Sequence, residues 1–184
     1  VELFNKLQEI WRVEHKKRGY QEIKTPIMLD KELWEISGHW FNYRENMYTS
    51  TIDEKEYAIK PMNCPGSIIA YKNNLHSYKD LPLKYGEMGL VHRHEFSGAL
   101  HGLMRVRAFT QDDAHVFCTK EQIEEQIIEI IDLYDKFYTL FGFEYHIELS
   151  TKPDKAIGSD EIWEMAESNL KSALEHKGIE YKLN

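Results

Sequence analysis

The chain has 184 residues, a length that fits one medium-sized domain with a core of its own. Its 42% hydrophobic and 29% charged residues are typical of a folded, soluble domain and exclude a disordered segment. The formal net charge of −8 excludes a protein that wraps nucleic acid through overall basicity. Residues 121–184 carry a net charge of −9 and residues 1–120 carry +1. The exclusion therefore holds for the chain as a whole and does not extend to residues 1–120 taken alone.

Five elements are predicted in the first 75 residues: a helix over 2–18, a strand over 20–27, one or two helical turns over 31–37, a strand over 56–60 and a helix from 67 to about 75. The first helix has an apolar stripe at helical spacing and ends at Gly19. The segment from Pro61 to Gly66 contains two prolines and a glycine, which predicts an irregular turn. Ser67 is expected to cap the helix that follows.

The remaining elements are strands over 86–95 and 105–117, a loop over 96–104, a helix from about 119 to 141, a strand over 143–149 and a helix over 159–177. Thr119 and Gln122 have capping-box spacing, and Gly142 is expected to end the helix that they begin. Helices and strands are mixed without a strict βαβ alternation. This order predicts an α+β fold with a mainly antiparallel sheet, flanked by helices, as a single domain over residues 1–184.

The cysteine count predicts the cellular compartment, and the two ends of the sequence predict that it is part of a longer protein. Two cysteines, Cys64 and Cys118, are too few for a disulfide framework and predict a reducing cytoplasm. No apolar run approaches the roughly 18–20 residues of a membrane-spanning helix, so no membrane partner is expected. The sequence opens inside a predicted helix, without a signal peptide, and stops inside a predicted strand. We therefore expect a piece of a longer protein.

The predicted strand over 105–117 carries an unusual row of side chains. Because alternate residues of a strand share a face, one face presents Arg107, Phe109, Gln111, Asp113, His115 and Phe117. Arginine binds phosphate in bidentate fashion, an aromatic ring stacks on a planar base, and a carboxylate accepts from an ammonium or hydroxyl group. The row predicts a ligand-binding face; the alternative is a solvated face with incidental salt bridges.

Two residues of this region have metal-binding side chains. Cys64 lies in the proline-bounded turn and His115 on the predicted strand, which allows a metal site assembled from distant segments. Two such residues do not establish a site by themselves. Cys118 is expected to point away from His115 and to be a buried small residue.

Several segments resemble the class II aminoacyl-tRNA synthetases. Arg18 to Pro26 (RGYQEIKTP) resembles their motif 1, and Val91 to Asp113 resembles their motif 2. Within that class, the strings KPMNCPG at 60–66 and RAFTQDDAH at 107–115 resemble the threonyl-tRNA synthetases. The resemblance covers essentially all 184 residues. Motif 3, a Gly-x-Gly-x-Gly pattern followed by Arg, is absent.

The resemblance implies a role for ten residues. ATP, with Mg²⁺, would be bound by Arg93, Glu95, Arg105 and Phe109. Met62, Gln111 and Asp113 would bind the amino-acid substrate. Arg93, Gln111 and His39 would take part in catalysis, His39 by assisting proton movement from the tRNA ribose hydroxyl. Cys64 and His115 would be two of three protein ligands to Zn²⁺, with the third, a histidine, beyond residue 184.

The implied reaction is activation of threonine with ATP to threonyl-adenylate and its transfer to the acceptor end of tRNA(Thr), by a homodimer with Pro26 near its interface. The 184 residues alone are expected to be inactive, because the arginine of motif 3 and one zinc ligand are missing. One alternative is a non-catalytic paralogue acting as a binding or regulatory module, which intact Arg93, Glu95 and Asp113 disfavour. Another is a prolyl or seryl enzyme of the same class, which Cys64 together with His115 disfavours.

Overall fold

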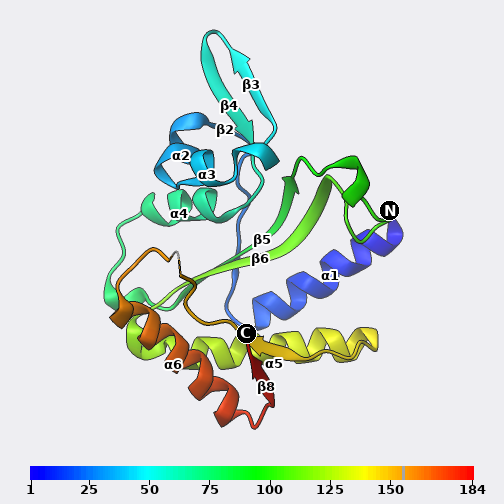
Figure 1. Cartoon of the computed structure of the whole chain (residues 1–184). Coiled ribbons are helices and arrows are strands. Elements are labelled where there is room, and N and C mark those ends of the chain that lie inside the picture. Colours follow the sequence, from blue (N-terminus) through cyan, green and yellow to red (C-terminus); the bar gives the residue numbers. More distant parts are fainter. Residues whose placement is uncertain (155) are drawn as a thin grey trace. The chain divides into compact units, whose positions relative to one another are not determined.

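The computed structural model describes residues 1–154 and 156–184, which form two compact units, Val1–Phe117 and Cys118–Asn184 (Figure 1). The first unit contains α1 (Glu2–Lys17), β1 (Gln21–Glu22), β2 (Met28–Asp30), α2 (Lys31–Ile36), α3 (His39–Asn42), β3 (Thr49–Ile52), β4 (Lys55–Ile59), α4 (Cys64–Lys72), β5 (Leu83–His92) and β6 (Ala108–Phe117). The second contains α5 (Ile123–Phe141), β7 (Ile147–Leu149), α6 (Asp160–His176) and β8 (Tyr181–Leu183). Within the described residues, no helix is long and apolar enough to cross a membrane.

The β5–β6 hairpin is the framework of the first unit, and its two strands lie side by side in Figure 1. They pair antiparallel over ten residues, with Glu87 opposite Asp113, Gly89 opposite Gln111 and Val91 opposite Phe109. The short strand β1 adds to the free edge of β5 in parallel. Because paired residues share a face, Glu87, Gly89 and Val91 lie on the same face as the row of side chains predicted to bind a ligand.

Helix α1 packs on the opposite face of this hairpin. A Cβ at Gly86 would lie 3.1 Å from the Trp11 ring and 3.3 Å from His15, so the missing side chain makes room for the helix. The Trp11 indole nitrogen donates to Asp112 at 2.5 Å, and His15 Nε2 lies 3.1 Å from the same oxygen. These contacts hold α1 behind the sheet and leave the face of Asp113 to the turn that precedes α4.

A second antiparallel sheet, in the order β2–β4–β3, packs against α2 and α3. Its buried core is Trp34, Met47 and Ala58, with Leu29, Trp40 and Tyr43 around them. The Asp30 side chain accepts from the Glu32 backbone N–H at 3.0 Å and caps α2. This sheet delivers the chain to the turn at residues 60–63.

The second unit has an apolar core made of Ile131, Leu149 and Leu174. The predicted capping box is confirmed, since Thr119 and Gln122 bond reciprocally at the helix start and the Thr119 backbone N–H donates to Gln122 at 2.9 Å. Gly142 ends α5 in the left-handed conformation with φ of 70°. Strands β7 and β8 pair in parallel.

The α+β fold is confirmed, with parallel pairs only at β1–β5 and β7–β8 among the described residues. The predicted cap at Ser67 was wrong: α4 begins at Cys64, Pro65 occupies its first turn, and Ser67 is fully buried inside the helix. The predicted strand over 20–27 is shorter, because Gln21–Glu22 pairs with β5 and the chain then crosses to β4 at Met28. Cys118 is only partly buried, because the strand ends at Phe117.

Candidate active site

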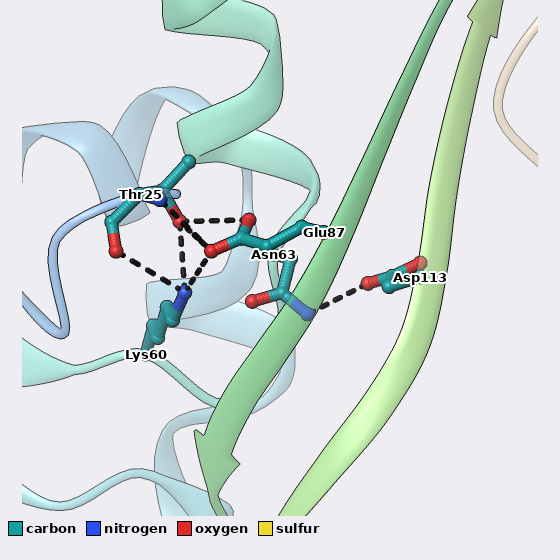
Figure 2. Close-up of polar contacts among 5 residues, drawn as sticks. All are labelled: Thr25, Lys60, Asn63, Glu87 and Asp113. Carbon is teal, nitrogen blue, oxygen red and sulfur yellow. Dashed lines mark hydrogen bonds and ion pairs between the residues drawn. The ribbon is translucent and has the colours of Figure 1, made fainter. Parts of the chain in front are cut away.

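A buried polar cluster joins three segments on the sheet face that is predicted to bind a ligand (Figure 2). The Lys60 ammonium donates to Glu87 Oε1 at 2.9 Å and to Thr25 Oγ1 at 2.8 Å. The Thr25 backbone N–H and hydroxyl also donate to Glu87, at 2.8 Å and 3.0 Å. The side chains of Lys60 and Glu87 are 2% and 4% exposed, so each charge depends on the other for compensation. The cluster ties the segment before β2 and the end of β4 to the middle of β5.

The turn that follows Lys60 contacts two of the predicted site residues. The carbonyl of Pro61 accepts from Arg93 Nε at 3.1 Å. The Asn63 amide nitrogen donates to Asp113 Oδ2 at 2.8 Å (Figure 2). Asn63 itself is 1% exposed. A single turn, anchored by a buried ion pair, therefore holds the arginine at the end of β5 and the carboxylate on β6.

The four residues predicted to bind ATP line one cavity of about 360 Å³. Its lining residues are Arg93, Glu95, Leu103, Met104, Arg105, Val106 and Phe109. The Arg93 guanidinium carbon lies 5.2 Å from the centre of the Phe109 ring, within cation–π range. The cavity thus combines a cation, an aromatic face and a carboxylate, which suits an anion attached to a planar ring.

Glu95 and Arg105 form an ion pair at the edge of this cavity. Glu95 Oε2 accepts from Arg105 Nε at 3.1 Å and from Arg105 Nη2 at 3.0 Å. The Arg105 side chain is 60% exposed, and an ion pair with such an exposed member contributes little to stability. Arg105 is therefore free to exchange this carboxylate for a phosphate at small cost. The backbone carbonyl of Glu95 is held separately, by Arg107 Nε at 3.0 Å.

Gln111, Asp113 and His115 follow Phe109 on the same face of β6, all partly buried. Asp113 also lies close to Cys64, at the start of α4. Burial of the Cys64 thiol raises its pKa, and the negative charge of Asp113 raises it further. The Cys64 thiol, the Asp113 carboxylate and the Asn63 amide therefore lie near one end of the row of side chains on β6.

Cys64 and His115 offer a thiol and an imidazole, which are donors that zinc prefers. Within residues 1–154 and 156–184, no three histidine, cysteine or acidic side chains are close enough to hold a metal ion together. The two side chains are of a type that suits zinc, and the described residues contain no group of three donors to complete such a site.

His39 and Met62 contact each other although they are far apart in sequence. His39 Nε2 lies 3.1 Å from Met62 Sδ, and His39 Nδ1 lies 2.9 Å from the Ser37 hydroxyl. The His39 ring also meets Trp34 edge-on at 5.6 Å. Partial burial lowers the pKa of His39 below its ordinary value of 6.5, which favours the neutral imidazole.

The sequence did not indicate the residues that support the predicted site from the side, namely Thr25, Lys60, Asn63, Glu87 and Gly89. Lys60 and Glu87 were visible as opposite charges in two predicted strands. Their pairing follows only from the spatial arrangement of β4 and β5, which a single sequence does not specify. Asn63 had no signal of its own beyond its place in the proline-bounded turn.

Known proteins similar to this chain belong to one family. Residues 47–182 match the family model described as tRNA synthetase class II core domain (G, H, P, S and T). The threonine–tRNA ligases of Fusobacterium nucleatum and Syntrophomonas wolfei are each 68% identical to the chain, over 98% and 99% of its length. The chain spans 29% of the length of either protein. The RNA binding domain of threonyl-tRNA synthetase from Cryptosporidium parvum superposes with a TM-score of 0.94 at 46% identity, over 99% of this chain and 46% of that one.

Proposed function

Because this chain belongs to the class II core domain family of the tRNA synthetases, we propose that the protein carrying it is a threonine–tRNA ligase. The protein would activate threonine with ATP and transfer it to the acceptor end of tRNA(Thr). The observation that carries the proposal is the shared face of β6: Phe109 lines the cavity with Arg93, and the same face continues through Gln111 to Asp113, which is bonded to Asn63 next to Cys64. ATP would lie at one end of this face and the amino acid at the other.

The activation step is attack of the threonine carboxylate on the α-phosphate of ATP, with pyrophosphate as the leaving group. Both reactants are anions, so the main barrier is to bring them together in line. Arg93 can neutralise and align them, because its guanidinium is held by Pro61 and by the Phe109 ring. Phe109 would stack on adenine, Glu95 would accept from its amino group, and Arg105 would bind the γ-phosphate. No side-chain nucleophile is required.

Selection of threonine over valine needs a polar contact, because the two side chains have nearly the same shape and an apolar pocket discriminates such pairs only about 10²-fold. The Asp113 carboxylate would accept from the threonine hydroxyl, with Gln111 near the carboxylate under attack and Met62 lining the pocket. Cys64 and His115 would hold a zinc ion, which when bound supplies an open position for the amine and hydroxyl of threonine.

His39 would assist the transfer step. Its lowered pKa keeps the imidazole neutral near pH 7, so that it can accept a proton from the ribose hydroxyl of tRNA. Ser37 and Met62 hold its two ring nitrogens. We further propose that the protein acts in the cytoplasm and as a homodimer, with Pro26 near the interface.

The proposal is tested by ATP-dependent attachment of labelled threonine to tRNA by the whole protein. We expect threonine to be attached, and Arg93→Ala to reduce kcat/KM by about 10²- to 10³-fold, the cost of removing one main source of transition-state charge stabilisation. A protein that binds ATP without attaching any amino acid would be the non-catalytic paralogue. Attachment of proline or serine instead would identify another specificity within the class.

Metal analysis of the whole protein tests the zinc site separately. We expect one zinc ion per chain, lost in Cys64→Ala and in His115→Ala. Cys118→Ala is the matched control, since Cys118 lies outside the site and should leave the zinc content unchanged. A protein without zinc that nevertheless attaches threonine would remove Cys64 and His115 from the mechanism.

A further inference from the structure

We propose that Asn63 is a positioning residue for threonine selection, and that Gly89 on β5 provides the space it needs. Asn63 would orient the Asp113 carboxylate toward the substrate hydroxyl without itself contacting the substrate. The inference rests on the proposed function, because that function assigns Asp113 to accept from the threonine hydroxyl. It adds a residue on which the selectivity of that site depends.

The first observation is the direct contact between the two side chains. Asn63 Nδ2 donates to Asp113 Oδ2 at 2.8 Å from a position that is 1% exposed (Figure 2). A hydrogen bond from a buried amide to a charged acceptor is strong and directional. With Oδ2 bonded to Asn63, Oδ1 is the oxygen left to accept from a substrate hydroxyl or ammonium.

The second observation is that the other end of the same amide has no partner. Asn63 Oδ1 is buried and accepts no hydrogen bond within the described part of the chain. A buried unsatisfied oxygen costs stability, and an apolar side chain of similar size would fill the space without that cost. Packing alone therefore does not account for an asparagine here, whereas the N–H that it donates to Asp113 does.

The third observation is the close approach of Asn63 to Gly89. A Cβ at Gly89 would lie 2.1 Å from Asn63 Nδ2, 2.5 Å from its Cγ and 2.6 Å from its Oδ1. Gly89 lies in the regular part of β5 and does not have a positive φ, so backbone freedom does not explain the glycine. The missing side chain makes room for the amide group, and any larger residue would displace it from Asp113.

The backbone of Asn63 is also held on both sides. Its carbonyl accepts from the Ser67 backbone N–H at 3.0 Å in the first turn of α4, and three residues earlier Lys60 is bonded within the buried cluster. Between them, the Pro61 carbonyl holds Arg93. The turn thus places the amide against Asp113 with little freedom to move.

The test is threonine-dependent and valine-dependent ATP–pyrophosphate exchange by the whole protein. In Asn63→Leu we expect KM for threonine to rise on the order of 10-fold or more, the usual effect of losing a hydrogen bond to a charged group. KM for ATP should change by less than about 3-fold, and kcat/KM for valine should be unchanged, because valine has no hydroxyl for Asp113 to accept from. Asn74→Leu, the same substitution at an exposed asparagine near the end of α4, is the matched control.

Gly89→Ala approaches the same contact from the other strand. We expect the same loss of threonine selectivity, and no additional loss when Gly89→Ala is combined with Asn63→Ala, since the shortened side chain leaves room for the new methyl group. If Gly89→Ala raises KM for threonine as much in the Asn63→Ala protein as in the wild type, the role assigned to Gly89 is wrong. If Gly89→Ala alone does not fold, recovery of folding in the double variant supports the steric argument, and no recovery contradicts it.

Asp113→Ala separates failure of this inference from failure of the proposed function. If KM for threonine rises in Asp113→Ala but not in Asn63→Leu, Asn63 has no positioning role and the proposed function stands. If threonine, valine and ATP parameters deteriorate together in Asn63→Leu, the residue is structural and the inference is wrong. If Asp113→Ala leaves threonine use unchanged, the assignment of Asp113 fails, and the role of Asn63 fails with it.

Discussion

Both compact units have an apolar core, but the first also buries several polar and charged side chains. In Val1–Phe117, fully or nearly fully buried polar groups include Thr25, Lys60, Asn63, Ser67 and Glu87. In Cys118–Asn184, the buried cluster is Ile131, Leu149 and Leu174, and Gln126 is the one buried polar residue among those that the structure describes. Burial of apolar side chains stabilises a unit at a lower cost in free energy than burial of polar ones. Stability alone therefore does not explain the buried polar groups of the first unit.

Charge follows the same division. Residues 1–120 carry +1, of which Lys120 is one positive charge, so Val1–Phe117 has no net charge and Cys118–Asn184 carries the entire −8. The arginines that face the cavity therefore lie in a neutral unit, apart from the acidic surplus in the sequence. A partner with negative charge would be expected on the first unit rather than on the second.

The largest effect is expected from Lys60→Met in the first unit. It leaves the Glu87 carboxylate buried at 4% exposure without its cation, which typically costs about 3–5 kcal/mol of unfolding free energy. Chemical denaturation of the purified protein measures it. The combined variant Lys60→Met, Glu87→Leu should recover part of the loss, because no charge is left buried. A loss of less than about 1 kcal/mol in Lys60→Met would show that the pair is not part of the core.

In the second unit, Leu174→Ala should cost about 2–5 kcal/mol, through lost burial and the cavity left behind. Below the unfolding transition its threonine and ATP kinetics should match the wild type, because Leu174 belongs to the core of the unit that does not carry the proposed site. Comparison of KM values with the Lys60→Met protein sharpens the contrast between the units. Altered substrate KM in Leu174→Ala would contradict the division into a functional unit and a supporting one.

A smaller effect is expected from Phe109→Leu. Loss of the aromatic face removes the contact with Arg93 and would remove the proposed stacking on the base, which together contribute about 0.5–2 kcal/mol, or a rise of about 2- to 30-fold in KM for ATP. Steady-state exchange at varied ATP concentration measures this. Phe143→Leu, at an aromatic residue of the second unit that is 62% exposed, is the control and should have no effect.

The smallest effect is a pH dependence of stability from His39. Its pKa in the folded chain lies below the ordinary value of 6.5, so just below that pH the unfolded chain binds more protons than the folded one. Stability should therefore fall slightly as the pH is lowered from 6.5 through the pKa of the folded state, and should then level off. Denaturation at several pH values would detect the trend, which His39→Gln should reduce. A gain in stability on acidification of this interval would contradict the burial of His39.

Much of the fold was predictable because local signals agreed with the final structure. The helices predicted over 2–18, from about 119 to 141 and over 159–177 were all confirmed within a few residues, and glycines were expected to end the first two. The order of side chains on β6 followed from strand alternation alone, because the strand is regular over ten residues. The reliable predictions were therefore those from periodic patterns that extend over ten residues or more.

The errors arose where tertiary pairing outweighs local signals. Ser67 has the usual chemistry of a helix cap, but Pro65 suits the first turn better and moves the helix start to Cys64. Residues 20–27 alternate like one strand, but the chain leaves the edge of β5 after Glu22 to reach β4. The contact between Asn63 and Asp113 joins residues 50 positions apart, and only the packing of the turn on β5 creates it.

The most direct test of the account is ATP–pyrophosphate exchange by the whole protein with threonine, serine, valine and proline in turn. The account predicts exchange with threonine at the highest kcat/KM, weaker exchange with serine, which shares the hydroxyl, and little with valine or proline. In Asp113→Ala the preference for threonine over valine should largely disappear. Equal exchange with threonine and valine in the wild type, or a preference for proline, would contradict the account.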